Sequence, residues 1–242
     1  MEKYAHKREY VLRYSDFDFL DVLKPSALLA LTQESACLSA DELGFGYEDL
    51  KPKKLAFIIV GTHCKFLRPI VLGDRLEVET WPLSPRRFFM ERGYLARANG
   101  ELVAQISSRW CLVDFETFSL QLPDKLGEAH EKCPYRDEKS LDTDFKIPKI
   151  HEGVKVKERE AMLGECDHYY HVNNTRYADY FFDCLSQEEL SRPVESFRIS
   201  YLKQTKAGSI LSFYREDTAA EIVLDARLGE ETVSRFVVTF AN

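Results

Sequence analysis

One order of predicted elements occurs twice along the chain, and this repeat constrains the fold more than any single motif. In each half, alternating β-forming residues predict a strand, an apolar period of 3.6 predicts a helix, and a meander of strands follows. In the first half these elements fall at 9–13, 25–44, 57–67, 75–82, 88–98 and 102–115. In the second half they fall at 154–159, after Asp167, and at 194–202, 209–214, 221–226 and 233–240. The repeat predicts an α+β fold with two antiparallel sheets, each wrapped around one long helix.

A few residues align the two halves directly. Gly73 in the first meander aligns with Gly208 in the second, 135 positions later, and Asp18 before the first helix aligns with Asp167, 149 positions later. The two offsets differ by 14, so the second half should have a shorter connection from helix to sheet. Between the halves, residues 123–148 are charged and lack apolar periodicity, which is typical of a linker that crosses the surface. We therefore expect domains at 1–122 and 149–242, joined by a linker at 123–148.

Length and composition restrict the class of protein. A chain of 242 residues can bury a core of its own, and 45% hydrophobic with 30% charged residues is ordinary for a globular protein. The net charge of −7 argues against nucleic acid or an anionic membrane as a partner, because both attract basic surfaces. The N-terminal residues lack the apolar region of a secretory signal, and the six cysteines contain no CxxC pair. We expect reduced thiols and a cytoplasmic protein.

Two blocks together resemble a known family. One is DHYYHVNNTRY, which opens the second predicted helix, and the other is FLRPIVLGDRLEVETW in the first half. Together they resemble the acyl-acyl carrier protein thioesterases of bacteria and plant plastids. The resemblance covers nearly the whole chain and implies a tandem (double) hot-dog fold. It also implies a hydrolase that cleaves fatty acyl-acyl carrier protein (acyl-ACP), with the carrier protein as partner and no cofactor.

The resemblance also assigns site residues, with two departures. The family's catalytic Asp falls on Asp167 and its catalytic His on His171. Its Asn falls on Tyr169 and its Glu on Gln204, while Thr205 lies where some members carry a Cys. Water activation in this chain therefore differs in detail from the family pattern.

These residue types fit what thioester hydrolysis requires. A histidine exchanges protons near neutral pH, so His171 is the expected base, with Asp167 orienting it or holding the water. The amide of Gln204 and the hydroxyl of Tyr169 can offer hydrogen bonds to water or substrate. Both His171 and Asp167 also have a structural alternative, because Asp18 repeats Asp167 in a half where Val22 replaces the histidine.

The second helix is expected to begin near Asn173 or Asn174, and a backbone amide there is the expected oxyanion donor. The matching positions in the first half are Lys24 and Pro25, so we expect one active site per chain, in the second half. The resemblance implies that the first half forms much of the acyl pocket. Four residues are candidate walls, with the closed core as the alternative place for them: Leu28, Leu31, Phe57 and Ile59.

Other sites and functions were weighed against this interpretation. Cys166, His168 and His171 do not have a spacing that forces them onto one metal ion, so no metal is expected. The alternatives are a thioesterase for coenzyme A esters, a hot-dog dehydratase, and a non-catalytic acyl-binding protein. Since two fused hot-dog units already supply a pseudo-dimer, either a monomer or a homodimer is possible.

Overall fold

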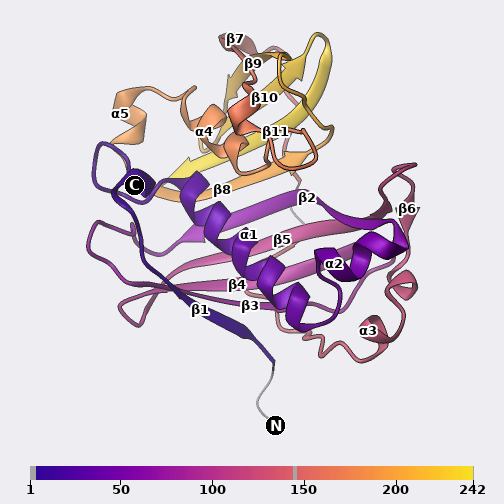
Figure 1. The fold of residues 1–242 in the computed structure, drawn as a ribbon. Coiled ribbons are helices and arrows are strands. Elements are labelled where there is room, and N and C mark those ends of the chain that lie inside the picture. The colour runs from indigo at the N-terminus through magenta and orange to yellow at the C-terminus, as the bar shows by residue number, and fades with distance from the viewer. Residues whose placement is uncertain (1–3, 144–145, 242) are drawn as a thin grey trace.

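The computed structural model describes residues 4–143 and 146–241. Within these residues a single 11-stranded sheet runs through both halves of the chain (Figure 1). The strand order is β1-β3-β4-β5-β2-β8-β11-β10-β9-β7, with β6 on β5, and every pairing between strands is antiparallel. The strands are β1 His6–Tyr10, β2 Leu55–Phe66, β3 Leu76–Pro82, β4 Phe89–Ala98, β5 Glu101–Asp114, β6 Leu120–Gln121, β7 Val154–Glu160, β8 Val194–Tyr201, β9 Ile210–Asp217, β10 Ile222–Leu228 and β11 Glu231–Phe240.

The sheet has an internal twofold relation. Its first five strands, β1-β3-β4-β5-β2, recur in reverse as β8-β11-β10-β9-β7, and the two sets join where β2 pairs with β8. At that junction His63 lies opposite Arg198, 135 positions later in the chain. This is the offset that relates Gly73 to Gly208, so the local axis passes between His63 and Arg198. The double hot-dog fold is confirmed, but the two predicted sheets are continuous.

The two central helices differ in length. Helix α1, Pro25–Glu42, has a proline in its first turn and lies along the concave face of the first half of the sheet (Figure 1). Its counterpart α4, Arg176–Phe182, has only seven residues, so the prediction of a long second helix was wrong. The two offsets predicted a shorter path from helix to sheet in the second half, and the shorter helix accounts for this difference. The other helices are α2 Tyr47–Leu50, α3 Glu128–Glu131, α5 Gln187–Leu190 and the 3-10 turns η1 Tyr14–Asp16, η2 Lys51–Lys53, η3 Pro123–Leu126 and η4 Leu163–Glu165.

One hydrophobic core spans both halves. Leu28 of α1 and Tyr94 of β4 belong to the same cluster of buried residues as Phe181 of α4 and Phe236 of β11. The rings of Phe181 and Phe236 stack with centroids 4.9 Å apart, an arrangement that aromatic pairs favour. The shared core means that neither half buries all of its own apolar surface.

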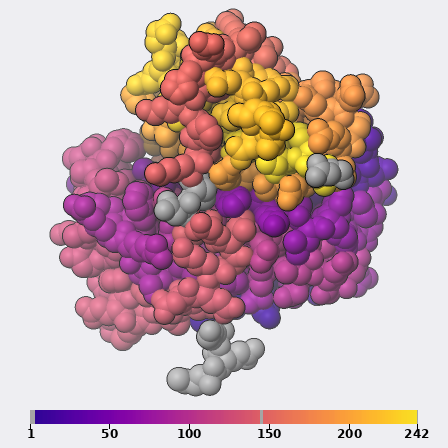
Figure 2. Space-filling view, turned by 180° about the vertical axis from the view of Figure 1, so that it is seen from behind, coloured from indigo at the N-terminus to yellow at the C-terminus, as the bar shows by residue number. Residues whose placement is uncertain are grey.

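The segment after β6 packs on the first half before it reaches β7. The indole of Trp81 donates a hydrogen bond of 2.8 Å to the Glu138 carbonyl, and the hydroxyl of Ser140 is buried and bonds to the Ile106 carbonyl. Figure 2 shows this salmon-coloured segment on the back of the first half, below the orange and yellow second half. The part of the predicted linker around Glu138 and Ser140 is therefore bound to the first half. Residues 144 and 145 of the predicted linker lie outside the described residues.

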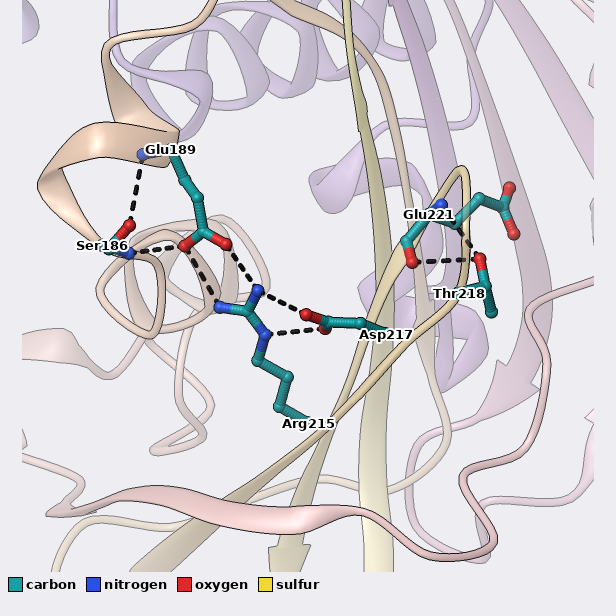
Figure 3. A network of polar contacts seen from close by, with 6 residues as sticks. All are labelled: Ser186, Glu189, Arg215, Asp217, Thr218 and Glu221. Atoms are coloured by element: carbon teal, nitrogen blue, oxygen red, sulfur yellow. Dashed lines mark hydrogen bonds and ion pairs between the residues drawn. The ribbon is translucent and has the colours of Figure 1, made fainter.

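A polar network holds α5 against the sheet of the second half (Figure 3). Arg215 of β9 lies between two carboxylates, with Nη1 3.1 Å from Glu189 of α5 and Nε 2.7 Å from Asp217. Ser186 caps α5 in a reciprocal arrangement with Glu189, each side chain accepting a hydrogen bond from the other residue's backbone. The pKa of Glu189 is lowered to about 2, chiefly by its hydrogen bonds from Arg215. The chain that follows α4 is thereby fixed to β9.

Among the described helices, none is both long enough and apolar enough to span a membrane.

Candidate functional site

The loop that opens α4 is closed by the side chain of Asp167. The Asp167 amide donates to the His171 carbonyl at 2.8 Å, and Asp167 Oδ1 accepts from the Tyr169 amide at 2.8 Å and the His171 amide at 3.4 Å. Tyr170 takes a positive φ of 60° to complete the turn. Asp167 therefore fixes the backbone on which His171 is presented.

The first half contains the same turn without the histidine. Asp18 Oδ1 accepts from the Leu20 amide at 2.8 Å and the Val22 amide at 3.0 Å, and Asp21 has a positive φ of 56°. These contacts repeat those of Asp167 at the offset of 149 found in the sequence. One oxygen of Asp167 thus has the structural role that was the alternative to catalysis. No hydrogen bond to its other oxygen, Oδ2, is found among the described residues.

His171 lies beside the loop that follows β8. Its backbone forms a bridge with Lys206, and the next amide, that of Val172, donates to the Thr205 carbonyl at 2.8 Å. Gln204 is exposed there and makes no hydrogen bond with the described residues. Thr205 is buried, and its hydroxyl accepts a 2.7 Å hydrogen bond from Tyr177 of α4. The fold therefore brings His171 and Gln204 to neighbouring segments, and the buried polar contact belongs to Thr205.

Tyr169 connects this loop to the first half of the chain. Its ring lies 4.0 Å from that of His168, which in turn contacts Tyr47 of α2 with centroids 5.5 Å apart. Burial, helped by the nearby Tyr47, Asp167 and Cys37, raises the pKa of Tyr169. The aromatic contacts fix the loop against α2, where an asparagine would have no ring to pack.

The two asparagines have different surroundings. Asn173 Oδ1 accepts hydrogen bonds from the Thr175 amide at 3.0 Å and the Thr175 hydroxyl at 2.9 Å, and the Asn173 amide donates to the Glu165 carbonyl. The side-chain oxygen and the backbone N–H of Asn173 therefore both shape the start of α4. In the described part of the chain, no hydrogen-bond acceptor is found for the backbone N–H of Asn174. Of the two predicted oxyanion donors, the backbone amide of Asn174 is the one without a hydrogen-bond acceptor in the described residues.

Asn174 also reaches a small polar cavity between the halves. Its side chain lines this cavity with Gln33 of α1 and Thr62 of β2. The hydroxyl of Tyr201 is buried beside the side chains of Asn174 and Thr62, and burial raises its pKa. Oε1 of Gln33 is buried there without a hydrogen-bond partner among the described residues. Buried polar atoms are normally satisfied, so Oε1 of Gln33 marks a place where a water or a ligand group would be accommodated.

Glu165 anchors the start of the loop before α4, and the sequence analysis did not single it out. It accepts a 2.7 Å hydrogen bond from the Tyr180 hydroxyl, pairs with Arg159, and accepts from the Met162 amide. Although its burial acts in the opposite direction, these contacts lower the pKa of Glu165. The internal repeat could have indicated this residue. Asp16, 149 positions earlier, accepts a hydrogen bond from the Arg13 amide just as Glu165 accepts one from the Met162 amide.

An apolar pocket lies in the first half of the chain. Its cavity volume is about 100 Å³, and its walls come from α1, the start of β2, the end of β3, β4 and β5. Of the expected wall residues, Phe57 lines this pocket and Ile59 lines the smaller polar cavity. Leu28 is fully buried in the core, and Leu31 packs against that core, so neither lines a cavity. Cys37 contributes to the pocket wall and also helps to raise the pKa of Tyr169, which links one wall of the pocket to the candidate site.

No group of three or more His, Cys, Asp or Glu side chains in the described residues is arranged to hold a metal ion.

Comparisons with known proteins agree with this architecture. Residues 3–122 match the acyl-ACP thioesterase N-terminal domain, and residues 150–235 match the acyl-ACP thioesterase C-terminal domain. An acyl-ACP thioesterase from Bacteroides thetaiotaomicron VPI-5482 is 20% identical with a TM-score of 0.90, covering 98% of both chains. The 12:0-ACP thioesterase from Umbellularia californica is also 20% identical, with a TM-score of 0.88 over 98% of this chain and 97% of that one.

Curated relatives are longer than this chain. Oleoyl-acyl carrier protein thioesterase 2, chloroplastic, from Arabidopsis thaliana is 22% identical over 91% of this chain and 65% of its own length. Oleoyl-acyl carrier protein thioesterase 1, chloroplastic, from the same plant is 24% identical over 76% of this chain and 56% of its own length. The chain thus spans about three fifths of the plant proteins it matches. Because the two family domains match its two halves in order, the chain belongs to the acyl-ACP thioesterase family.

Proposed function

We propose that the protein hydrolyses fatty acyl-ACP thioesters and releases free fatty acid. The observation that carries this proposal is an apolar pocket whose wall residue Cys37 influences the pKa of Tyr169 in the Asp167–His171 loop, in a chain whose two halves match this family. The first half supplies the acyl pocket, and the second half supplies the residues for water attack. The acyl carrier protein is the proposed partner, the cytoplasm is the proposed compartment, and these steps require no cofactor.

In this proposal His171 accepts a proton from the attacking water. The carboxylate of Asp167 lies four residues away across the turn and favours the positively charged imidazolium that forms. The backbone N–H of Asn174 has no other acceptor in the described residues. It donates to the thioester carbonyl oxygen as negative charge develops there. Because Asp167 Oδ1 holds the turn, its Oδ2 is the oxygen available to His171 or to the water.

Gln204 and Tyr169 have supporting roles in this scheme. Gln204 is exposed at the rim, from which its amide can hold the water or the substrate carbonyl but cannot accept a proton. Tyr169 holds the loop against α2 through His168 and Tyr47. Neither is proposed as an acid or a base, so proton transfer falls to His171.

The test is to incubate the purified protein with acyl-ACP and acyl-coenzyme A esters of matched chain length. The cysteines are free thiols and Cys37 is exposed, where it would react with thiol reagents, so the released fatty acid should be measured directly by mass spectrometry. We expect faster release from the carrier protein. Equal turnover on both carriers would remove the carrier-specific part of the proposal, and no release from any ester would remove hydrolysis.

A second function, acyl binding without hydrolysis, is favoured by one observation. Asp167 makes the same turn contacts as Asp18, and the neutral Gln204 replaces the family's glutamate in an exposed position. If this function is correct, the natural protein binds acyl carriers without cleaving them. Gln204→Glu would then be expected to initiate hydrolysis by restoring a second carboxylate.

A further inference from the structure

Polar side chains from both halves of the chain meet at the small cavity beside Asn174. The cavity has a volume of about 10 Å³, close to the space that one water molecule needs. Gln33 of α1 and Thr62 of β2 line it from the first half, and Asn174 lines it from the second. The hydroxyl of Tyr201 of β8 is buried beside Thr62 and Asn174. We call Gln33, Thr62, Asn174 and Tyr201 the polar quartet.

Gln33 is the residue in this cavity whose hydrogen bonding is incomplete. On the cavity wall, the Tyr94 hydroxyl and the Trp110 indole N–H both bond to the Ser108 hydroxyl, at 2.8 Å and 2.7 Å. Oε1 of Gln33, by contrast, is buried without a hydrogen-bond partner among the described residues. A buried acceptor without a partner destabilises a protein, so an amide at this position indicates a use other than packing.

The internal repeat shows what this position looks like without the candidate site. The loops and central helices of the two halves correspond at an offset of 149, and the paired strands β2 and β8 correspond at an offset of 135. In the first-half loop Val22 stands where the second half has His171. The counterparts of the polar quartet are all apolar: Phe182 for Gln33, Phe197 for Thr62, Pro25 for Asn174 and Phe66 for Tyr201.

Three of these counterparts pack against one another. The ring centroid of Phe197 lies 6.1 Å from that of Phe66 and 6.0 Å from that of Phe182, and Phe197 is fully buried. Aromatic rings therefore fill the equivalent place in the fold. Packing alone does not require the polar quartet, which occurs only beside the loop that carries His171.

We infer that one water molecule occupies this cavity, donates a hydrogen bond to Oε1 of Gln33 and bridges it to the side-chain amide of Asn174. The bridge fixes Asn174, so that its backbone N–H keeps its direction toward the thioester carbonyl. Gln33 is thus a positioning residue that the first half contributes to the site of the second. This inference rests on the proposed function, in which the Asn174 N–H stabilises the oxyanion.

The kinetic test replaces Gln33 with methionine, which has a similar length but no amide. In Gln33→Met we expect kcat for acyl-ACP to fall roughly tenfold, less than the roughly 10²–10³-fold loss of an oxyanion donor itself. KM should change by less than about twofold, because substrate binding in the apolar pocket is untouched. Gln33→Glu keeps an acceptor oxygen and should recover part of the rate. Glu34→Gln, at an exposed neighbour that lines neither cavity, is the matched control.

Thermal unfolding separates positioning from a merely structural role. Because the apolar Phe182 occupies the equivalent place in the repeat, Gln33→Met should unfold at the same temperature as the natural protein or at a higher one. A lowered melting temperature with a raised KM would make Gln33 structural and overturn the inference. A native kcat in a folded Gln33→Met variant would overturn it as well.

A crystal structure tests the water without any hydrolysis, so failure of the inference and failure of the proposed function are distinguishable. The natural protein should hold one ordered water within hydrogen-bond distance of Gln33 and Asn174, and Gln33→Met should lack this water and show a turned Asn174 side chain. If this is observed but no ester is cleaved, the positioning of Asn174 stands and the hydrolase proposal fails. An empty cavity in the natural protein would overturn the inference.

Discussion

At the scale of single residues, the most informative comparison is between Asp18 and Asp167. Both carboxylates accept two backbone hydrogen bonds in the same turn, yet only Asp167 precedes a histidine. The chain therefore contains its own reference for the structural role of this aspartate. Any effect found at Asp167 and absent at Asp18 belongs to the chemistry of the second half.

We predict that Asp167→Asn and Asp18→Asn both fold with near-native stability, because the asparagine oxygen can accept the same backbone hydrogen bonds. Turnover should fall roughly tenfold or more in Asp167→Asn, since the charge that favours the imidazolium is lost. In Asp18→Asn it should not change. Thermal unfolding and fatty acid release measure the two quantities. Full activity in Asp167→Asn would assign this residue to the turn alone.

His171→Ala should lower turnover by roughly 10²–10⁴-fold, the usual contribution of a positioned base, without unfolding the protein. Steady-state release from acyl-ACP measures the effect, and circular dichroism verifies the fold. His151→Ala, at an exposed histidine outside the site, is the control. A folded His171→Ala variant with a native rate would show that the histidine is structural.

At the scale of elements, α5 has only four residues, none fully buried, and among them only Leu190 packs against the core. Its contact with β9 is the Glu189–Arg215–Asp217 network (Figure 3). Since α5 follows α4 closely, this network also restrains the end of α4. Its strength should depend on pH.

The pKa of Glu189 is lowered to about 2 in the folded protein, against roughly 4.3 in an unfolded chain. Its stabilising contribution is therefore complete above the unfolded value and is lost as the pH falls from about 4 toward 2. We predict that Glu189→Gln lowers the free energy of unfolding at pH 7 by roughly 1 kcal/mol, after allowance for solvent screening. The difference from the natural protein should shrink below about pH 4.

Urea unfolding at several pH values measures this dependence. Glu188→Gln removes a neighbouring exposed charge from the same turn of α5 and is the matched control. A loss of stability in Glu189→Gln that is the same at every pH would contradict an ionic origin.

At the scale of the whole molecule, the two halves are joined by backbone pairing and by a shared core. The β2–β8 pairing makes the sheet continuous, and residues of α1 and α4 lie in one cluster. If the halves were separated, β2 and β8 would become exposed edges, and apolar surface on both sides would meet water. The double hot-dog should therefore behave as one cooperative unit.

We predict that residues 149–242, produced alone, do not form a stable monomer, and that they fold when produced together with residues 1–148. Size-exclusion chromatography and circular dichroism of each fragment and of the pair measure this. The intact chain is the control. A second half that folds alone as a monomer would show that the β2–β8 pairing is dispensable, and would make the boundary an independent domain border.

The repeat, the strand–helix–meander order and the turn residues Asp18 and Asp167 could be read from the sequence, because they depend on local periodicity and short-range hydrogen bonds. The tertiary structure decided that the two predicted sheets are one, because strand pairing across 135 positions leaves no local pattern. It also decided the short α4, since the helical spacing of Tyr177, Tyr180 and Phe181 indicates a face but not where the helix ends. The sequence could likewise not show that Arg92 is buried and bonded to the Ser39 hydroxyl, because burial and hydrogen-bond partners depend on which distant side chains the fold brings together.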